Sequence, residues 1–157
     1  MKTPILVLIF NRPEKTKGLY EIICRQKPAK LYIAADGPRE NRPNEPELCK
    51  QTRAIFDNID WPCEKKTFYR EQNVGCGVAV SEAITWFFKQ EENGIILEDD
   101  CHPNDDFFTF CEEMLHRYKD HSEIKLISGS NYQDGRQWGK NSYYFSKMCH
   151  IWGWASW

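Results

Sequence analysis

Short apolar runs alternate along this chain with longer segments in which apolar residues recur every three or four positions. The runs cover residues 5–10, 31–35, 95–97 and, more weakly, 124–127. A continuous apolar run bounded by polar or turn residues is typical of a strand that is buried on both faces of a parallel sheet. We therefore expect strands at these four positions and a further strand at residues 65–70.

The segments between these runs have the spacing of amphipathic helices. Their apolar residues lie within residues 19–23, 48–59, 80–87 and 107–118. Alternating strands and helices predict one α/β domain over residues 1–157, with a mostly parallel central sheet that helices cover on both faces. Residues 36–46 hold three prolines, five charged residues and no aliphatic residue, and we expect them to form a mobile loop.

Charge and composition exclude several classes of protein. The chain has 157 residues, a formal net charge of −2 and no block of Lys or Arg, which argues against a nucleic-acid partner. No apolar run approaches the ~20 residues of a membrane-spanning helix, and no signal peptide is recognisable. The seven cysteines include no C-x-x-C pair, so they predict reduced thiols in a cytoplasmic protein.

The last six residues hold three of the six tryptophans: Trp152, Trp154 and Trp157. Folded domains seldom end on bare aromatic surface. We expect either that the chain is a C-terminally truncated, N-terminal part of a longer protein, or that a partner subunit in a homo-oligomer covers these side chains.

Polar residues that could bind a ligand or take part in catalysis follow three of the predicted strands: Asn11 and Arg12, then Asp36, then Glu98, Asp99 and Asp100. Parallel sheets bind ligands at the carboxyl ends of their strands, and Mg²⁺ or Mn²⁺ prefers carboxylate oxygens. Further along, Asp105 and Asp106 suit the start of a helix, whereas Glu112 and Glu113 are expected on its solvated face. The acidic group at residues 98–100 is therefore the strongest candidate for a metal or substrate site.

Several segments resemble one family in order and spacing. Residues 95–100 (IILEDD) resemble the Glu-Asp-Asp motif of GT-A glycosyltransferases of the N-acetylglucosaminyltransferase I family and its bacterial relatives. Residues 5–13 (ILVLIFNRP) and 32–37 (YIAADG) look like that family's first two strands with their nucleotide-contacting ends. Residues 127–135 (ISGSNYQDG) and 150–157 (HIWGWASW) resemble its downstream segments beside the acceptor. The resemblance implies a Rossmann-like, three-layer GT-A fold.

The resemblance also implies roles for single residues. Asp100 would coordinate Mn²⁺ or Mg²⁺ between the two phosphates of a nucleotide-diphospho-sugar. The donor would be contacted by five further side chains: Asn11, Arg12, Asp36, Glu98 and Asp99. A carboxylate beside the nucleobase accepts an N–H from uracil or guanine, so Asp36 predicts a preference for UDP over GDP and for both over other nucleotides. Residues 73–77 (NVGCG) are expected to form a tight turn into a helix, with backbone N–H groups available to an anion.

The function implied is a metal-dependent transferase of polysaccharide biosynthesis, cytoplasmic or peripheral to the inner membrane. It would move a hexosyl or N-acetylhexosaminyl group to a glycan or lipid-linked glycan. The catalytic base follows the Trp152–Trp154 segment in that family, beyond residue 157, so we expect donor binding with little turnover; Asp134 is the weak alternative base. Two other functions stay open: a sugar-phosphate nucleotidyltransferase, and a non-catalytic module that binds a nucleotide-sugar or a partner chain. Some bacterial relatives are named haemolytic proteins, but the sequence has no amphipathic membrane helix to support lysis.

Overall fold

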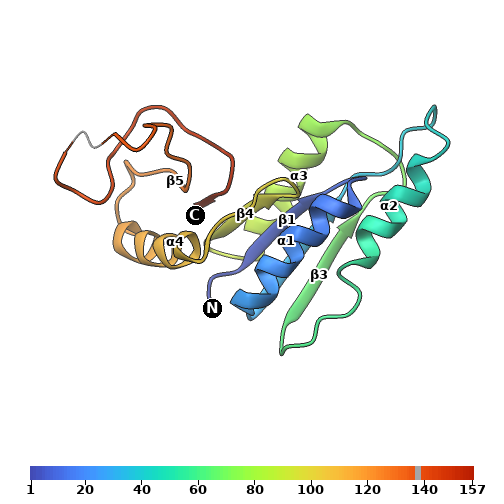
Figure 1. The fold of residues 1–157 in the computed structure, drawn as a ribbon, viewed down its shortest axis with the longest axis horizontal. Helices are drawn as coiled ribbons and strands as arrows, with labels where there is room; N and C mark the ends of the chain where they lie inside the picture. Colours follow the sequence, from blue (N-terminus) through green and yellow to red (C-terminus); the bar gives the residue numbers. More distant parts are fainter. Residues whose placement is uncertain (137–138) are drawn as a thin grey trace.

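The computed structural model describes residues 1–136 and 139–157, and these residues form six strands and four helices (Figure 1). The strands are β1 (Ile5–Ile9), β2 (Lys30–Ala35), β3 (Glu64–Tyr69), β4 (Gly94–Glu98), β5 (Ile127–Ser128) and β6 (Trp154–Ser156). The helices are α1 (Pro13–Gln26), α2 (Glu45–Ala54), α3 (Cys76–Phe88) and α4 (Asp105–Tyr118). The predicted α/β class is confirmed.

All six strands belong to one sheet, in the order β3-β2-β1-β4-β6-β5. β1 pairs in parallel with β2 and β4, and β2 pairs in parallel with β3, so four strands run in one direction. β6 runs antiparallel to β4, with Trp154 opposite Ile96, and β5 runs antiparallel to β6. The carboxyl ends of β1, β2, β3 and β4 therefore share one edge of the sheet.

Helices cover both faces of this sheet, as the alternating pattern predicts. One apolar cluster joins the sheet to α1 and α4 through side chains such as Leu19 and Phe108, and α2 packs beside α1. A second cluster joins the opposite face to α3 through Ala83 and Phe87. All five residues of β1 are buried between the two clusters, which explains why its sequence is apolar without alternation.

Local sequence signals set the ends of the helices. Pro13, whose fixed φ suits the first helical turn, begins α1, and Lys27 ends it in the left-handed conformation. The side chain of Asn104 accepts a hydrogen bond of 3.1 Å from the Phe107 amide and caps α4, whose first turn holds Asp105 and Asp106 as predicted. Among the described residues, no helix combines the length and apolar character that crossing a bilayer requires.

The prediction of a strand over residues 124–127 is largely wrong. Only Ile127 of that run belongs to a strand, and the Ile124 amide donates to the His121 carbonyl in a turn, at 3.0 Å. β5 lies at the outer edge of the sheet and pairs with β6 alone, a strand of three residues. Because the partner strand is so short, the hydrogen-bond ladder cannot extend back over the rest of the apolar run.

The prediction of a mobile loop over residues 36–46 is wrong at both ends of the segment. Asp36 is buried at the end of β2, and Glu45 is buried in the first turn of α2. Pro46 belongs to the start of this helix, a position where its missing N–H costs no hydrogen bond. The three prolines led composition to predict a loop in a segment that includes the start of a helix.

The prediction that Glu112 faces solvent is also wrong. Its carboxylate accepts hydrogen bonds from the amides of Lys2 and Thr3 at 3.0 and 2.9 Å, and from the Thr3 hydroxyl at 3.0 Å. Burial alone would raise the pKa of Glu112, but the hydrogen bonds from Thr3 and Lys2 outweigh it and lower the pKa. Glu112 thus fixes α4 to the residues that lead into β1.

Candidate functional site

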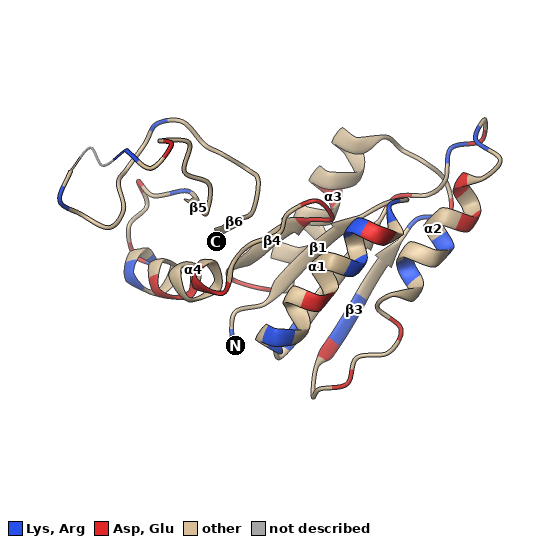
Figure 2. Ribbon diagram, in the orientation of Figure 1, with Lys and Arg blue, Asp and Glu red and all other residues tan. Residues whose placement is uncertain are grey.

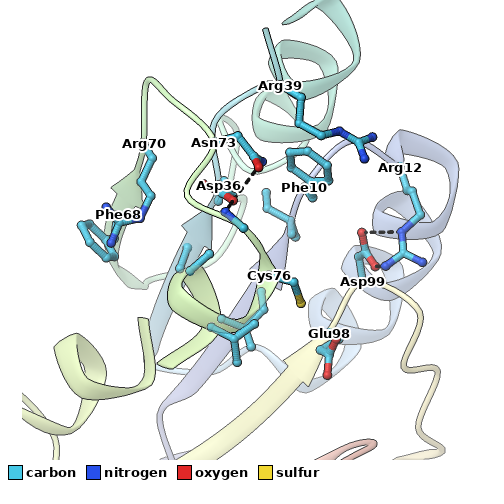
Figure 3. A pocket seen from close by; sticks show the side chains of 17 residues that line it. Phe10, Arg12, Asp36, Arg39, Phe68, Arg70, Asn73, Cys76, Glu98 and Asp99 are labelled. Carbon is cyan, nitrogen blue, oxygen red and sulfur yellow. Dashed lines mark hydrogen bonds and ion pairs between the residues drawn. The ribbon is translucent and has the colours of Figure 1, made fainter. Parts of the chain in front are cut away.

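A cavity of about 330 Å³ opens at the carboxyl edge of the parallel strands, beside the start of α3 (Figure 3). Four of the predicted donor-binding residues line it: Arg12, Asp36, Glu98 and Asp99. Ligands of parallel α/β sheets bind at this edge, so the cavity is the candidate site.

Arg12 and Asp99 form a close ion pair at one end of the cavity. Asp99 is 1% exposed, and Arg12 faces both of its oxygens, with Nε donating to Oδ2 at 3.1 Å. Burial raises the pKa of Asp99, and the guanidinium opposes this rise. Arg12 also donates to Asp100 at 3.2 Å, so one arginine holds both acids that follow β4, in the acidic turn of Figure 2.

Glu98 differs from its two acidic neighbours because it points into the cavity without a partner. Among the described residues, none donates a hydrogen bond to its carboxylate or forms an ion pair with it. Burial, together with the charges of Asp100 and Asp99, raises the pKa of Glu98. Its oxygens are therefore available to hydroxyl groups of a bound molecule.

Asp36 joins the end of β2 to the turn that precedes α3. Its carboxylate accepts from the amides of Gly37, Val74 and Gly75 at 2.9, 3.1 and 3.1 Å, and from the Asn73 side chain at 2.9 Å. These four donors match the roughly four acceptor sites of a carboxylate. The structure thus gives Asp36 partners other than the nucleobase that the resemblance implies.

Two glycines allow this junction to form. A Cβ on Gly37 would lie 2.4 Å from the backbone of Gln72, so only glycine fits between the two segments. Gly75 precedes α3 with a φ of +85°, a conformation that other residues rarely adopt. Residues 73–77 therefore form the expected tight turn, and Gly75 and Cys76 lie on the cavity wall.

Asn11 is held behind the cavity by Glu45, a residue that the sequence did not single out. The Glu45 carboxylate, 4% exposed, accepts from the Asn11 side chain at 2.8 Å and from the Arg39 amide at 2.7 Å, and it pairs with the Arg39 guanidinium. Arg39 lines the cavity and lies over the Phe10 ring at 5.6 Å. A Pro46 at the start of α2 is the one sequence signal that could have identified this arrangement.

Glu45 predicts a specific response to acid. The Arg39 side chain lowers the pKa of Glu45 from 4.5 to about 2, so the carboxylate stabilises the fold above pH ~4.5 and this contribution is lost towards pH ~2. We expect the free energy of unfolding to fall as the pH is lowered across that range. In Glu45→Gln it should depend less on pH. Urea unfolding followed by tryptophan fluorescence at several pH values measures it. Glu40→Gln, at a nearby exposed position, is the control, and equal pH profiles for both variants and the parent would contradict the assignment.

A third arginine lines the far end of the cavity. Arg70 lies over the Phe68 ring at 4.7 Å and pairs with Glu82 of α3. The Arg53 guanidinium donates to the Asp36 and Arg70 carbonyls at 2.9 and 2.7 Å, which fixes the ends of β2 and β3 together. With Arg12 and Arg39, Arg70 gives the wall three guanidinium groups, a group that also binds phosphate oxygens, and each of the three is paired with a carboxylate of the protein. Sequence analysis missed Arg39 and Arg70 because neither belongs to a motif.

The predicted metal ligand, Asp100, lies just outside this cavity. Its side chain is 32% exposed and accepts two long hydrogen bonds, one from Arg12 at 3.2 Å and one from the Trp152 indole at 3.3 Å. In the described part of the chain, no three Asp, Glu, His or Cys side chains are arranged to hold a metal by themselves. Mg²⁺ in phosphate-binding sites needs only one or two carboxylates, so this arrangement fits a cation whose other ligands are phosphates and water.

The three C-terminal tryptophans have different surroundings. Trp154 packs against the cluster on the α3 face, and Trp157 packs against the opposite cluster. Trp152 is 56% exposed. Whether a further segment or a partner subunit covers these residues stays a prediction.

The candidate base Asp134 does not line the cavity at the carboxyl edge of the sheet. It has a φ of +51° in a turn that the Arg136 amide closes on the Gln133 carbonyl at 2.9 Å, and its side chain is exposed. A second cavity, of about 1160 Å³, lies between α4 and residues 142–150, and Asp134 does not line it either.

Comparison with known proteins adds no information on this site, so its function is inferred from the side chains that line it. No protein-family model matches the chain, and no curated protein matches it. The cavity combines three guanidinium groups, the start of α3 and the Glu98 carboxylate, which has no partner among the described residues, and Asp100 lies beside the cavity. These groups suit a molecule that carries phosphates and hydroxyls.

Proposed function

We propose that the chain binds a nucleotide-diphospho-sugar and acts as a metal-dependent glycosyltransferase of the GT-A type. The observation that supports this most is the cavity at the carboxyl ends of β1, β2, β3 and β4, with arginines along its wall and Asp100 at its mouth. Phosphates would lie near Arg12 and Asp100, and the nucleoside would lie between Arg39 and Arg70. UDP stays the predicted nucleotide, although Asp36 is held by protein donors and so lends this preference no support. The acceptor would be a glycan or lipid-linked glycan.

Each group at the mouth has a role in this proposal. Asp100 would hold Mn²⁺ or Mg²⁺, and the cation would supply positive charge to a diphosphate leaving group. Arg12, fixed by Asp99, places a positive charge beside the same phosphates. Glu98, whose carboxylate lacks a protein partner among the described residues, would accept hydrogen bonds from ribose or sugar hydroxyls.

The nucleotidyltransferase alternative receives less support. Such enzymes need a phosphate-binding loop rich in backbone amides or basic residues after the first strand. Here α1 begins at Pro13, four residues after β1, and the intervening Asn11 is held by Glu45. The non-catalytic alternative is favoured by one observation, the exposed turn position of Asp134, and a donor-hydrolysis assay distinguishes it from a transferase.

Calorimetry with UDP tests the proposal. We expect UDP to bind in the presence of Mn²⁺ or Mg²⁺ and to bind about tenfold more weakly in excess chelator, because Asp100 would hold a cation that offsets the charge of the phosphates. Asp100→Asn should remove the dependence on metal, whereas Asp120→Asn, at an exposed position, should keep it. Equal affinity with and without chelator would refute the metal role, and no affinity for UDP or GDP would refute the function.

A further inference from the structure

Trp152 is fixed in place although its ring is more than half exposed. Its indole N–H donates to Asp100, and its carbonyl accepts a hydrogen bond of 2.9 Å from the Ser130 hydroxyl. On either side, the Ser128 hydroxyl donates to the His150 carbonyl at 2.9 Å and the Gly129 amide donates to the Gly153 carbonyl at 3.1 Å. The backbone of residues 150–153 is thus tied to residues 128–130 throughout.

The antiparallel direction of β6 explains why Trp152 faces the candidate site. β4 ends at Glu98, and β6 begins at Trp154 in the neighbouring position of the sheet. Residues that follow β4 and residues that precede β6 therefore meet at the same edge. The site groups follow the strand order along this edge: Asp36 after β2, Arg12 after β1, Asp100 after β4 and Trp152 before β6.

Trp152 is 56% exposed and is held at its indole N–H, so part of its side chain stays open to a bound molecule. Large aromatic groups that stay exposed while their position is fixed are common in binding sites. The cavity of about 330 Å³ is near the lower limit of the ~300–1,000 Å³ of ligand pockets, so a long ligand would extend past its mouth. Along this edge of the sheet, Trp152 comes after Asp100, so such a ligand would reach it.

We propose that Trp152 stacks on the sugar ring of the nucleotide-diphospho-sugar and so determines the preference for the glycosylated donor over the free nucleotide. This inference rests on the proposed function. The C–H groups on one face of a pyranose carry partial positive charge, and the face of an indole ring carries partial negative charge. The hydrogen bond to Asp100 would hold the indole beside the carboxylate at which the diphosphate is proposed to bind.

The test compares the affinity for UDP with the affinity for UDP-glucose and UDP-N-acetylglucosamine, all with Mn²⁺, by calorimetry. We expect Trp152→Ala to weaken binding of at least one UDP-sugar about tenfold and to leave the affinity for UDP nearly unchanged. Trp152→Phe should keep most of the UDP-sugar affinity, because it retains an aromatic face while losing the N–H donor. Ile151→Ala, at an adjacent position that is 60% exposed, is the matched control.

The outcomes separate the two proposals. Equal losses for UDP and UDP-sugars in both Trp152 variants would overturn stacking and show that Trp152 acts only by positioning Asp100. Unchanged affinities in Trp152→Ala would also overturn it. If the parent chain binds neither UDP nor the UDP-sugars, the proposed function fails and the stacking role fails with it.

Discussion

Replacement of Asp36 by alanine should lower the free energy of unfolding by about 3 kcal/mol. The substitution leaves the amides of Gly37, Val74 and Gly75 and the Asn73 side chain without their acceptor. The turn into α3 would no longer be fixed to β2. Because that turn forms part of the cavity wall, affinity for UDP and GDP should fall together.

Chemical unfolding and calorimetry on the same variants measure both effects. Asp36→Asn keeps one acceptor, the amide carbonyl oxygen, and should give an intermediate loss, whereas Asp120→Ala, at an exposed position, should change stability by less than about 0.5 kcal/mol. If Asp36→Ala left stability intact and altered only the preference between UDP and other nucleotides, Asp36 would contact the nucleobase, as the family resemblance implies.

Replacement of Arg12 by alanine should also destabilise the fold by about 3 kcal/mol, because it leaves a buried charge without a partner. Asp99 is 1% exposed, and both of its oxygens face the Arg12 guanidinium. Arg12→Lys should recover only part of the loss, since an ammonium group cannot pair with both oxygens in the same planar arrangement.

A double substitution makes the Arg12 prediction specific. Asp99→Asn removes the buried charge, so Arg12→Ala combined with Asp99→Asn should cost less than the sum of the two single changes. Arg25→Ala breaks an exposed pair with Asp105, at 3.6 Å, and serves as the control with an expected loss below about 0.5 kcal/mol. Additive losses in the double variant would show that the pair contributes nothing to stability.

The parallel half of the fold could be predicted from sequence because its signals are local. The apolar runs at residues 5–10, 31–35 and 95–97 form buried strands, and the turn after residue 73 begins a helix. The edge strand β5 could not be placed, because its length depends on β6, a strand more than twenty residues away.

The candidate site was predictable where a residue lies at the carboxyl end of a strand or within three residues after it. Arg12, Asp36, Glu98 and Asp99 were identified in this way, and all four line the cavity. The partners of these side chains were not predictable, because they depend on tertiary contacts. Glu45 is the clearest example: it lies in a proline-rich segment, and only the folded chain shows that it holds Asn11 and Arg39.

β4 lies between the parallel strands and the short antiparallel pair β5–β6, and this position affects which strands open first. β4 pairs with β1 on one side and with β6 on the other, and the β5–β6 pair joins the described parallel strands through β4 alone. These two strands are short, so fewer hydrogen bonds must break to release them than to release β1. Local opening should therefore begin at β5 and β6 while the parallel strands stay intact. The segment that holds Trp152 should then exchange its amide hydrogens with solvent before the strands that carry the cavity do.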